Sequence, residues 1–67
     1  MKSIVELINE LKGMDDLRLT ERFELGSEDV AHYRRIDFDN WLHRCVEPGR
    51  QFVDIQEAWG QYEKSFG

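Results

Sequence analysis

The sequence is poor in the features that cross-link, anchor or export a small protein. Its single cysteine, Cys45, excludes an intrachain disulfide. Its apolar runs are at most three residues long, whereas a membrane span needs about 20 apolar residues. The opening residues lead into Glu6 and Asn9 instead of the apolar core of a signal peptide. We therefore expect a cytoplasmic protein that does not cross a membrane.

Basic residues are outnumbered by acidic ones. The chain has 9 Lys and Arg against 14 Asp and Glu, which gives a formal net charge of −5. This balance argues against a protein that binds polyanions through a bulk positive field. Residues 1–30 carry a net charge of −4 and residues 31–67 only −1. The second half therefore leaves room for a local basic patch.

The sequence does contain enough apolar material for one core. It has 67 residues, 40% of them hydrophobic, with four Phe, two Tyr and two Trp. A chain of this length buries about 60% of the surface that its unfolded form exposes, which is too little for two cores. Because no repeat or Gly/Ser linker divides the chain, we expect one small helical domain over residues 1–67.

Capping residues predict helices at both ends of the chain. Ser3 and Glu6 have capping-box spacing, and an apolar stripe at helical spacing follows. This pattern predicts a helix over about 4–12, which Gly13 can close in a left-handed cap. Asp54 and Glu57 have the same capping-box spacing, which predicts the last helix of the chain.

A third helix is predicted before the only proline. Asp37 can cap it, and Pro48-Gly49 can end it with a turn. Four apolar residues share one face of this segment: Phe38, Trp41, Leu42 and Cys45. We expect Trp41 and Trp59 to lie in the core and Cys45 to be a small buried apolar group.

A central segment allows two interpretations. Apolar and polar side chains alternate over residues 17–25, which leaves open an α+β fold with a β-hairpin in residues 17–38. The charges favour two helices instead. Asp15 or Asp16 can cap the first and Ser27 the second, and the second then has acids in its first turn and bases in its last.

In the helical interpretation, residues 16–35 have the pattern of two crossed helices. Apolar side chains fall where such helices meet: Leu19, Phe23, Leu25, Val30 and Tyr33. Thr20 is the small residue at the crossing, and Ser27 is a usual cap. The segment resembles the helix-turn-helix of repressor-like DNA-binding domains. It departs from that pattern at Glu24, where the family usually has glycine and another residue costs about 1 kcal/mol.

The resemblance implies an all-α fold of four or five short helices and a DNA-binding transcriptional regulator of phage or plasmid type, acting as a homodimer. The second helix would lead into the major groove, with Glu28 and Asp29 in a first turn that is normally neutral or basic. Carried over by position, the candidates for base contacts are Ser27, Glu28, Ala31 and His32. The candidates for phosphate contacts are Arg18, Arg34 and Arg35.

The charge distribution supports a second hypothesis. The net charge of −4 in residues 1–30 suits an acidic protein–protein interaction module, or an inhibitor, that contacts a basic, nucleic-acid-binding partner. It predicts that the isolated protein does not bind duplex DNA even at low salt, where proteins that bind DNA nonspecifically are retained on it.

Catalytic, metal and cofactor sites are not expected. His43 and Cys45 are two residues apart, which points them to different faces of a helix and suits neither zinc nor a nucleophile–base pair. The sequence has no Gly-rich phosphate loop. Near the end of the chain, Tyr62 and Phe66 are candidate hydrophobic anchors for a protein partner or a second copy.

Overall fold

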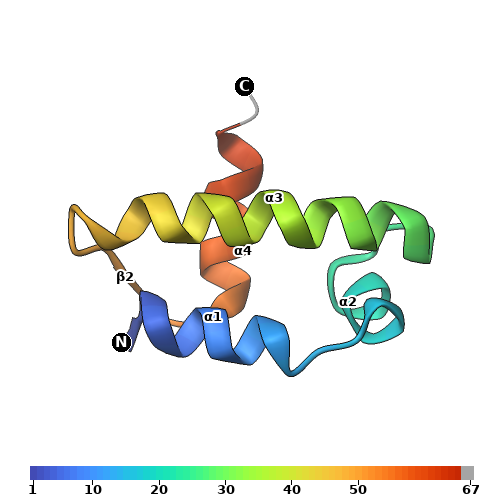
Figure 1. Ribbon diagram of the computed structural model, residues 1–67, viewed down its shortest axis with the longest axis horizontal. Helices are drawn as coiled ribbons and strands as arrows, with labels where there is room; N and C mark the ends of the chain where they lie inside the picture. Colours follow the sequence, from blue (N-terminus) through green and yellow to red (C-terminus); the bar gives the residue numbers. More distant parts are fainter. Residues whose placement is uncertain (66–67) are drawn as a thin grey trace.

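The computed structural model of the protein describes residues 1–65 and is mostly helical. The elements, in chain order, are β1 (Lys2–Ser3), α1 (Ile4–Lys12), α2 (Asp16–Phe23), α3 (Glu28–Val46), β2 (Gln51–Phe52) and α4 (Ile55–Lys64). α1 and α3 lie side by side and run in opposite directions, α2 lies near the beginning of α3, and α4 crosses behind α3 (Figure 1). The all-α prediction of four or five helices is confirmed.

Side-chain caps begin all four helices. Each cap accepts a hydrogen bond from the backbone N–H three residues later, at distances of 2.8 to 3.3 Å. The capping residues are Ser3, Asp15, Ser27 and Asp54. Because such caps satisfy N–H groups that have no partner inside the helix, they fix where each helix starts.

Gly13 ends α1 differently from the prediction. Its φ of −77° and ψ of −11° are right-handed, not left-handed. Its N–H donates to the carbonyls of Asn9 and Glu10 at 3.2 and 3.1 Å. The chain therefore stays in a tight helical turn, and Asp15 caps the next helix two residues later. A left-handed reversal is not needed over so short a link.

α3 is one helix of 19 residues where the sequence predicted two segments. Asp37 is therefore not a cap. It lies within α3, and its Oδ2 accepts a hydrogen bond from the hydroxyl of Tyr62 at 3.0 Å. The helix continues because no glycine or proline interrupts residues 28–46. It ends as predicted before Pro48, with Gly49 in the following turn at a φ of 68°.

The two short strands are not those of the hairpin considered for residues 17–38, which form most of α2, the turn after it and the first part of α3. Lys2 pairs with Phe52 and Ser3 with Gln51, in antiparallel register. The alternation near residue 19 is instead the helical spacing of Leu19 and Phe23, four residues apart on one face of α2. The ribbon joins the start of α1 to the segment before α4.

Aromatic rings pack together in the core between α3 and α4. Phe38, fully buried, has its ring centroid 5.0 Å from that of Trp59 and 5.2 Å from that of Tyr62. Trp59 also stacks on Phe23 at 4.2 Å. Trp41 packs against the same cluster. The predictions that both tryptophans and Cys45 are buried are confirmed.

Candidate interaction site at α2 and α3

α2, α3 and the turn between them form the segment that resembles a helix-turn-helix. Leu19 and Phe23 of α2 are buried, as predicted. Glu24 follows with a φ of 54° and a ψ of 52°, which is the left-handed conformation. The left-handed turn therefore begins at the position where the family has glycine, and Gly26, with a φ of 82°, continues it.

Thr20 lies where α2 meets the start of α3. Its hydroxyl donates to the carbonyl of Asp16 at 2.7 Å and shares that hydrogen with the carbonyl of Ser27 at 3.3 Å. Ser27 in turn caps α3. A larger side chain at residue 20 would push the turn away from α2, so the small residue suits the crossing.

The face of α3 that meets α2 is not the predicted one. Ala31 is fully buried, whereas Val30 and Tyr33 are 41% and 73% exposed. The aromatic core fixes the rotation of the helix, and Ala31 lies two turns before Phe38, so both face inward. Val30 and Tyr33 were wrongly predicted as contacts between the helices. Ala31 cannot contact a base edge because it is covered.

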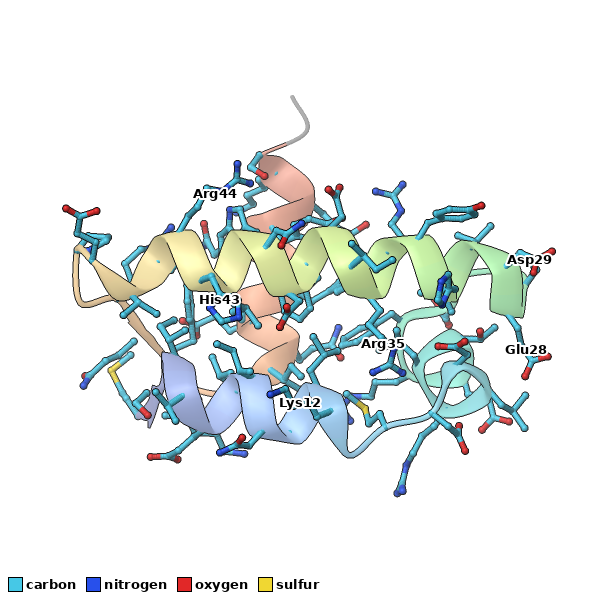
Figure 2. The ribbon with its side chains drawn as sticks, in the orientation of Figure 1. Lys12, Glu28, Asp29, Arg35, His43 and Arg44 are labelled. Carbon is cyan, nitrogen blue, oxygen red and sulfur yellow. The ribbon has the colours of Figure 1, made fainter. Side chains whose placement is uncertain are left out.

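The side chain of Arg35 forms hydrogen bonds within the protein and is not free to contact phosphate. Its Nη1 donates to the carbonyl of Leu11 at 2.7 Å, its Nη2 to the carbonyl of Met14, and its Nε to Asp16 Oδ1 at 3.2 Å. Figure 2 shows the side chain reaching from α3 toward the link between α1 and α2. The guanidinium also meets the negative end of α1. Arg35 is therefore not the free phosphate contact that the sequence predicted.

Arg34 and Tyr62 are also engaged on the inner side of α3. Burial raises the pKa of the Tyr62 hydroxyl, the hydrogen bond to Asp37 raises it further, and the neighbouring Arg34 lowers it. Tyr62 is buried, so it is not the exposed anchor that the sequence suggested. Phe66 lies outside the described residues.

Arg18 lies on a different side of α2 from Thr20, because two residues turn a helix by about 200°. It lines a hollow of about 330 Å³ together with Arg22, Glu10 and Met14. The three predicted phosphate contacts therefore occupy three separate places: Arg18 beside α1, Arg34 near α4, and Arg35 inside the junction of α1, α2 and α3. They do not form one basic surface.

Carboxylates dominate this end of the molecule instead. Residues 15–29 hold six acids and two bases, a net charge of −4 out of −5 for the whole chain. Figure 2 shows Glu28 and Asp29 at the free end of α3. We define the acidic end as the exposed carboxylates of this segment: Asp15, Glu21, Glu24, Glu28 and Asp29. Ser27 is exposed among them.

The two histidines and the cysteine are dispersed along α3. His32 is exposed, with Nδ1 3.8 Å from Asp16 Oδ2, and His43 Nε2 lies 3.5 Å from Asp39 Oδ2. Cys45 is buried. Over residues 1–65, no three His, Cys, Asp or Glu side chains are grouped for a metal ion. None of the helices in this range is long and apolar enough to cross a membrane.

Comparisons with family models, with curated proteins and with solved structures find no match to this chain. Sequence reasoning missed the roles of Arg35 and Asp37, whose partners lie 19 to 25 residues away. Such distant pairings leave no local pattern in the sequence. The concentration of acids between residues 15 and 29, in contrast, can be read directly from it.

Proposed function

We propose that this chain is a cytoplasmic, non-enzymatic interaction module whose acidic end binds a basic partner of the nucleic-acid-binding kind. One observation carries the proposal. The carboxylates of residues 15–29 are mostly exposed at one end of the molecule, while Arg35, from the same end, is bound to Leu11, Met14 and Asp16. The surface there consequently attracts cations.

The physical basis is long-range attraction followed by many weak ion pairs. A field of one sign speeds the encounter with a partner of the opposite sign. Exposed ion pairs contribute about 0.2–1 kcal/mol each, and salt screens them within about 10 Å. Binding should therefore weaken steeply as salt rises.

A labelled peptide of mixed Lys and Arg provides the probe, with fluorescence anisotropy as the measurement. The triple variant Glu21→Gln, Glu24→Gln, Glu28→Gln should bind it about tenfold more weakly, since three lost pairs amount to about 1–2 kcal/mol. The control removes three exposed acids elsewhere: Glu6→Gln, Glu47→Gln and Glu63→Gln. Equal weakening by both triples would contradict a localised site.

DNA binding through α2 and α3 is the second candidate, and the turn favours it. Glu24 takes the left-handed conformation at the position where the helix-turn-helix pattern requires one, and Thr20 bridges the crossing. In this candidate the exposed contacts would be Ser27, Glu28 and His32.

Random duplex DNA at low salt separates the two candidates. A DNA-binding protein is retained there even without its specific site, because phosphate contacts dominate under those conditions. We expect no anisotropy change for labelled duplex with this protein. Saturable binding of duplex that His32→Ala and Arg18→Ala weaken would favour the second candidate.

A further inference from the structure

The outward side of α3 combines exposed apolar groups with opposite charges at its two ends. We define the outer face of α3 by five exposed residues, which fall within about 80° of one another around the helix. They are Asp29, Tyr33, Ile36, Asn40 and Arg44. Tyr33 is 73% and Ile36 49% exposed, near the middle of the helix. Such large exposed apolar side chains mark contact surfaces when they lie together.

The charged groups at the ends of this face match the dipole of α3 but have no side-chain partner among the described residues. Over residues 1–65, neither Asp29 nor Arg44 takes part in an ion pair or a side-chain hydrogen bond. Glu28 accompanies Asp29 at the beginning of α3, and His43 accompanies Arg44 near its end. Figure 2 shows these two pairs toward opposite ends of the helix.

The spacing of these residues is self-complementary. Asp29 and Arg44 are equally far along the chain from the point between residues 36 and 37, and so are Tyr33 and Asn40. A twofold axis through that point would place each Asp29 opposite an Arg44 of the second copy. Two Ile36 side chains would then meet beside the axis. Such an interface uses the same patch on both copies.

We propose that the outer face of α3 binds a second copy of this chain, with the two α3 helices antiparallel. The antiparallel arrangement also sets the positive end of each helix dipole beside the negative end of the other. A helix of 19 residues is about 28 Å long. Its one face is smaller than the roughly 800 Å² per partner of a standard interface. The dimer is consequently reversible and sensitive to salt.

The dimer leaves the acidic end largely available. Asp15 caps α2, Glu21 lies on α2 and Glu24 lies in the turn that follows it, all away from the outer face of α3. The proposed basic partner and the second copy can therefore bind at the same time. A dimer carries two acidic ends, which would increase avidity for a partner with two basic segments.

Charge reversal tests the pairing directly, with sedimentation equilibrium at low salt as the measurement. The wild-type chain should shift from 8.0 kDa toward twice that mass as its concentration rises. Asp29→Arg and Arg44→Asp should each weaken self-association at least tenfold, since each places like charges in contact. An equimolar mixture of the two variants should dimerise again, because both pairs across the axis then join opposite charges.

Two further variants keep the result interpretable. Arg22→Asp changes an exposed arginine of α2 and should dimerise like the wild type. Ile36→Glu places two carboxylates beside the axis at an exposed position within the helix, so it should abolish the dimer while circular dichroism stays unchanged. A wild-type chain that stays monomeric at millimolar concentration would overturn the proposal. A dimer that survives Ile36→Glu, or a mixture that does not recover, would overturn it too.

Discussion

The two ends of α3 are held in place by different kinds of contact. Around Phe38 and Trp41, the helix packs on aromatic rings of α4 and β2. Around Ala31, it meets α2, where Phe23 is the one aromatic ring and Arg35 and Thr20 supply polar links. Apolar burial scales with buried area, whereas each hydrogen bond adds only about 1 kcal/mol. We therefore expect the region of α3 that contacts α2 to be the less stable one, and it also carries the exposed acids of residues 15–29.

Phe38→Ala should have the largest effect, because it opens a cavity in the aromatic cluster. We expect a loss of about 3–5 kcal/mol in the free energy of unfolding, measured by urea denaturation with circular dichroism. Since small domains have total stabilities of about that size, the variant should be mostly unfolded. Val53→Ala, at an exposed position, is the control and should change stability by less than about 0.5 kcal/mol. A loss below about 1 kcal/mol for Phe38→Ala would show that the core lies elsewhere.

Arg35→Met should loosen the α2 end selectively. It removes the side-chain donor to the carbonyl of Met14 and one of the donors to the carbonyl of Leu11, which keeps the N–H of Met14, at a cost of about 1–3 kcal/mol. Hydrogen exchange should speed up at the amides of α2 and much less at those of α4. Arg18→Met removes an exposed arginine of α2 and should leave both rates unchanged. Uniform acceleration along the whole chain would mean that the two ends unfold as one unit.

Tyr62→Phe should cost about 1 kcal/mol, because it removes the hydrogen bond to Asp37. It should also change the response to alkaline pH. The pKa of Tyr62 is raised in the folded protein above its ordinary value of 10.0. Its contribution to stability is therefore complete below pH 10 and is lost as pH rises through the folded-state pKa. Denaturation at increasing pH should show a smaller alkaline loss in the variant, and an unchanged alkaline loss would contradict this assignment.

Glu24→Gly should have the smallest effect, and the opposite sign. Glycine adopts the left-handed conformation without the steric cost that Glu24 bears, so we expect a gain of about 0.5–1 kcal/mol in thermal or urea denaturation. Glu21→Gly, inside α2, provides the contrast and should lose about 1 kcal/mol. A loss at both positions would show that the strain at Glu24 is not relieved by glycine.

Local patterns predicted the helix starts well and the surfaces of α3 poorly. Ser3, Ser27 and Asp54 cap helices as predicted, because a cap and its N–H partner are three residues apart. Asp37 and Arg35 were misjudged, because their partners come from other elements. For the candidate site, the acidic composition of residues 15–29 was evident, but the dispersal of the three arginines was not.

The order of amino acids by itself determined the helical class, the caps, the turn after α3 and the acidic character of the first half. These depend on neighbours within about four residues and on composition. Only the tertiary structure decided which side of α3 faces the core. Ala31 is buried and Tyr33 is exposed, the reverse of what the sequence predicted. The reason is that the aromatic cluster around Phe38 sets the rotation of one continuous helix. The outer face of α3 follows from that rotation.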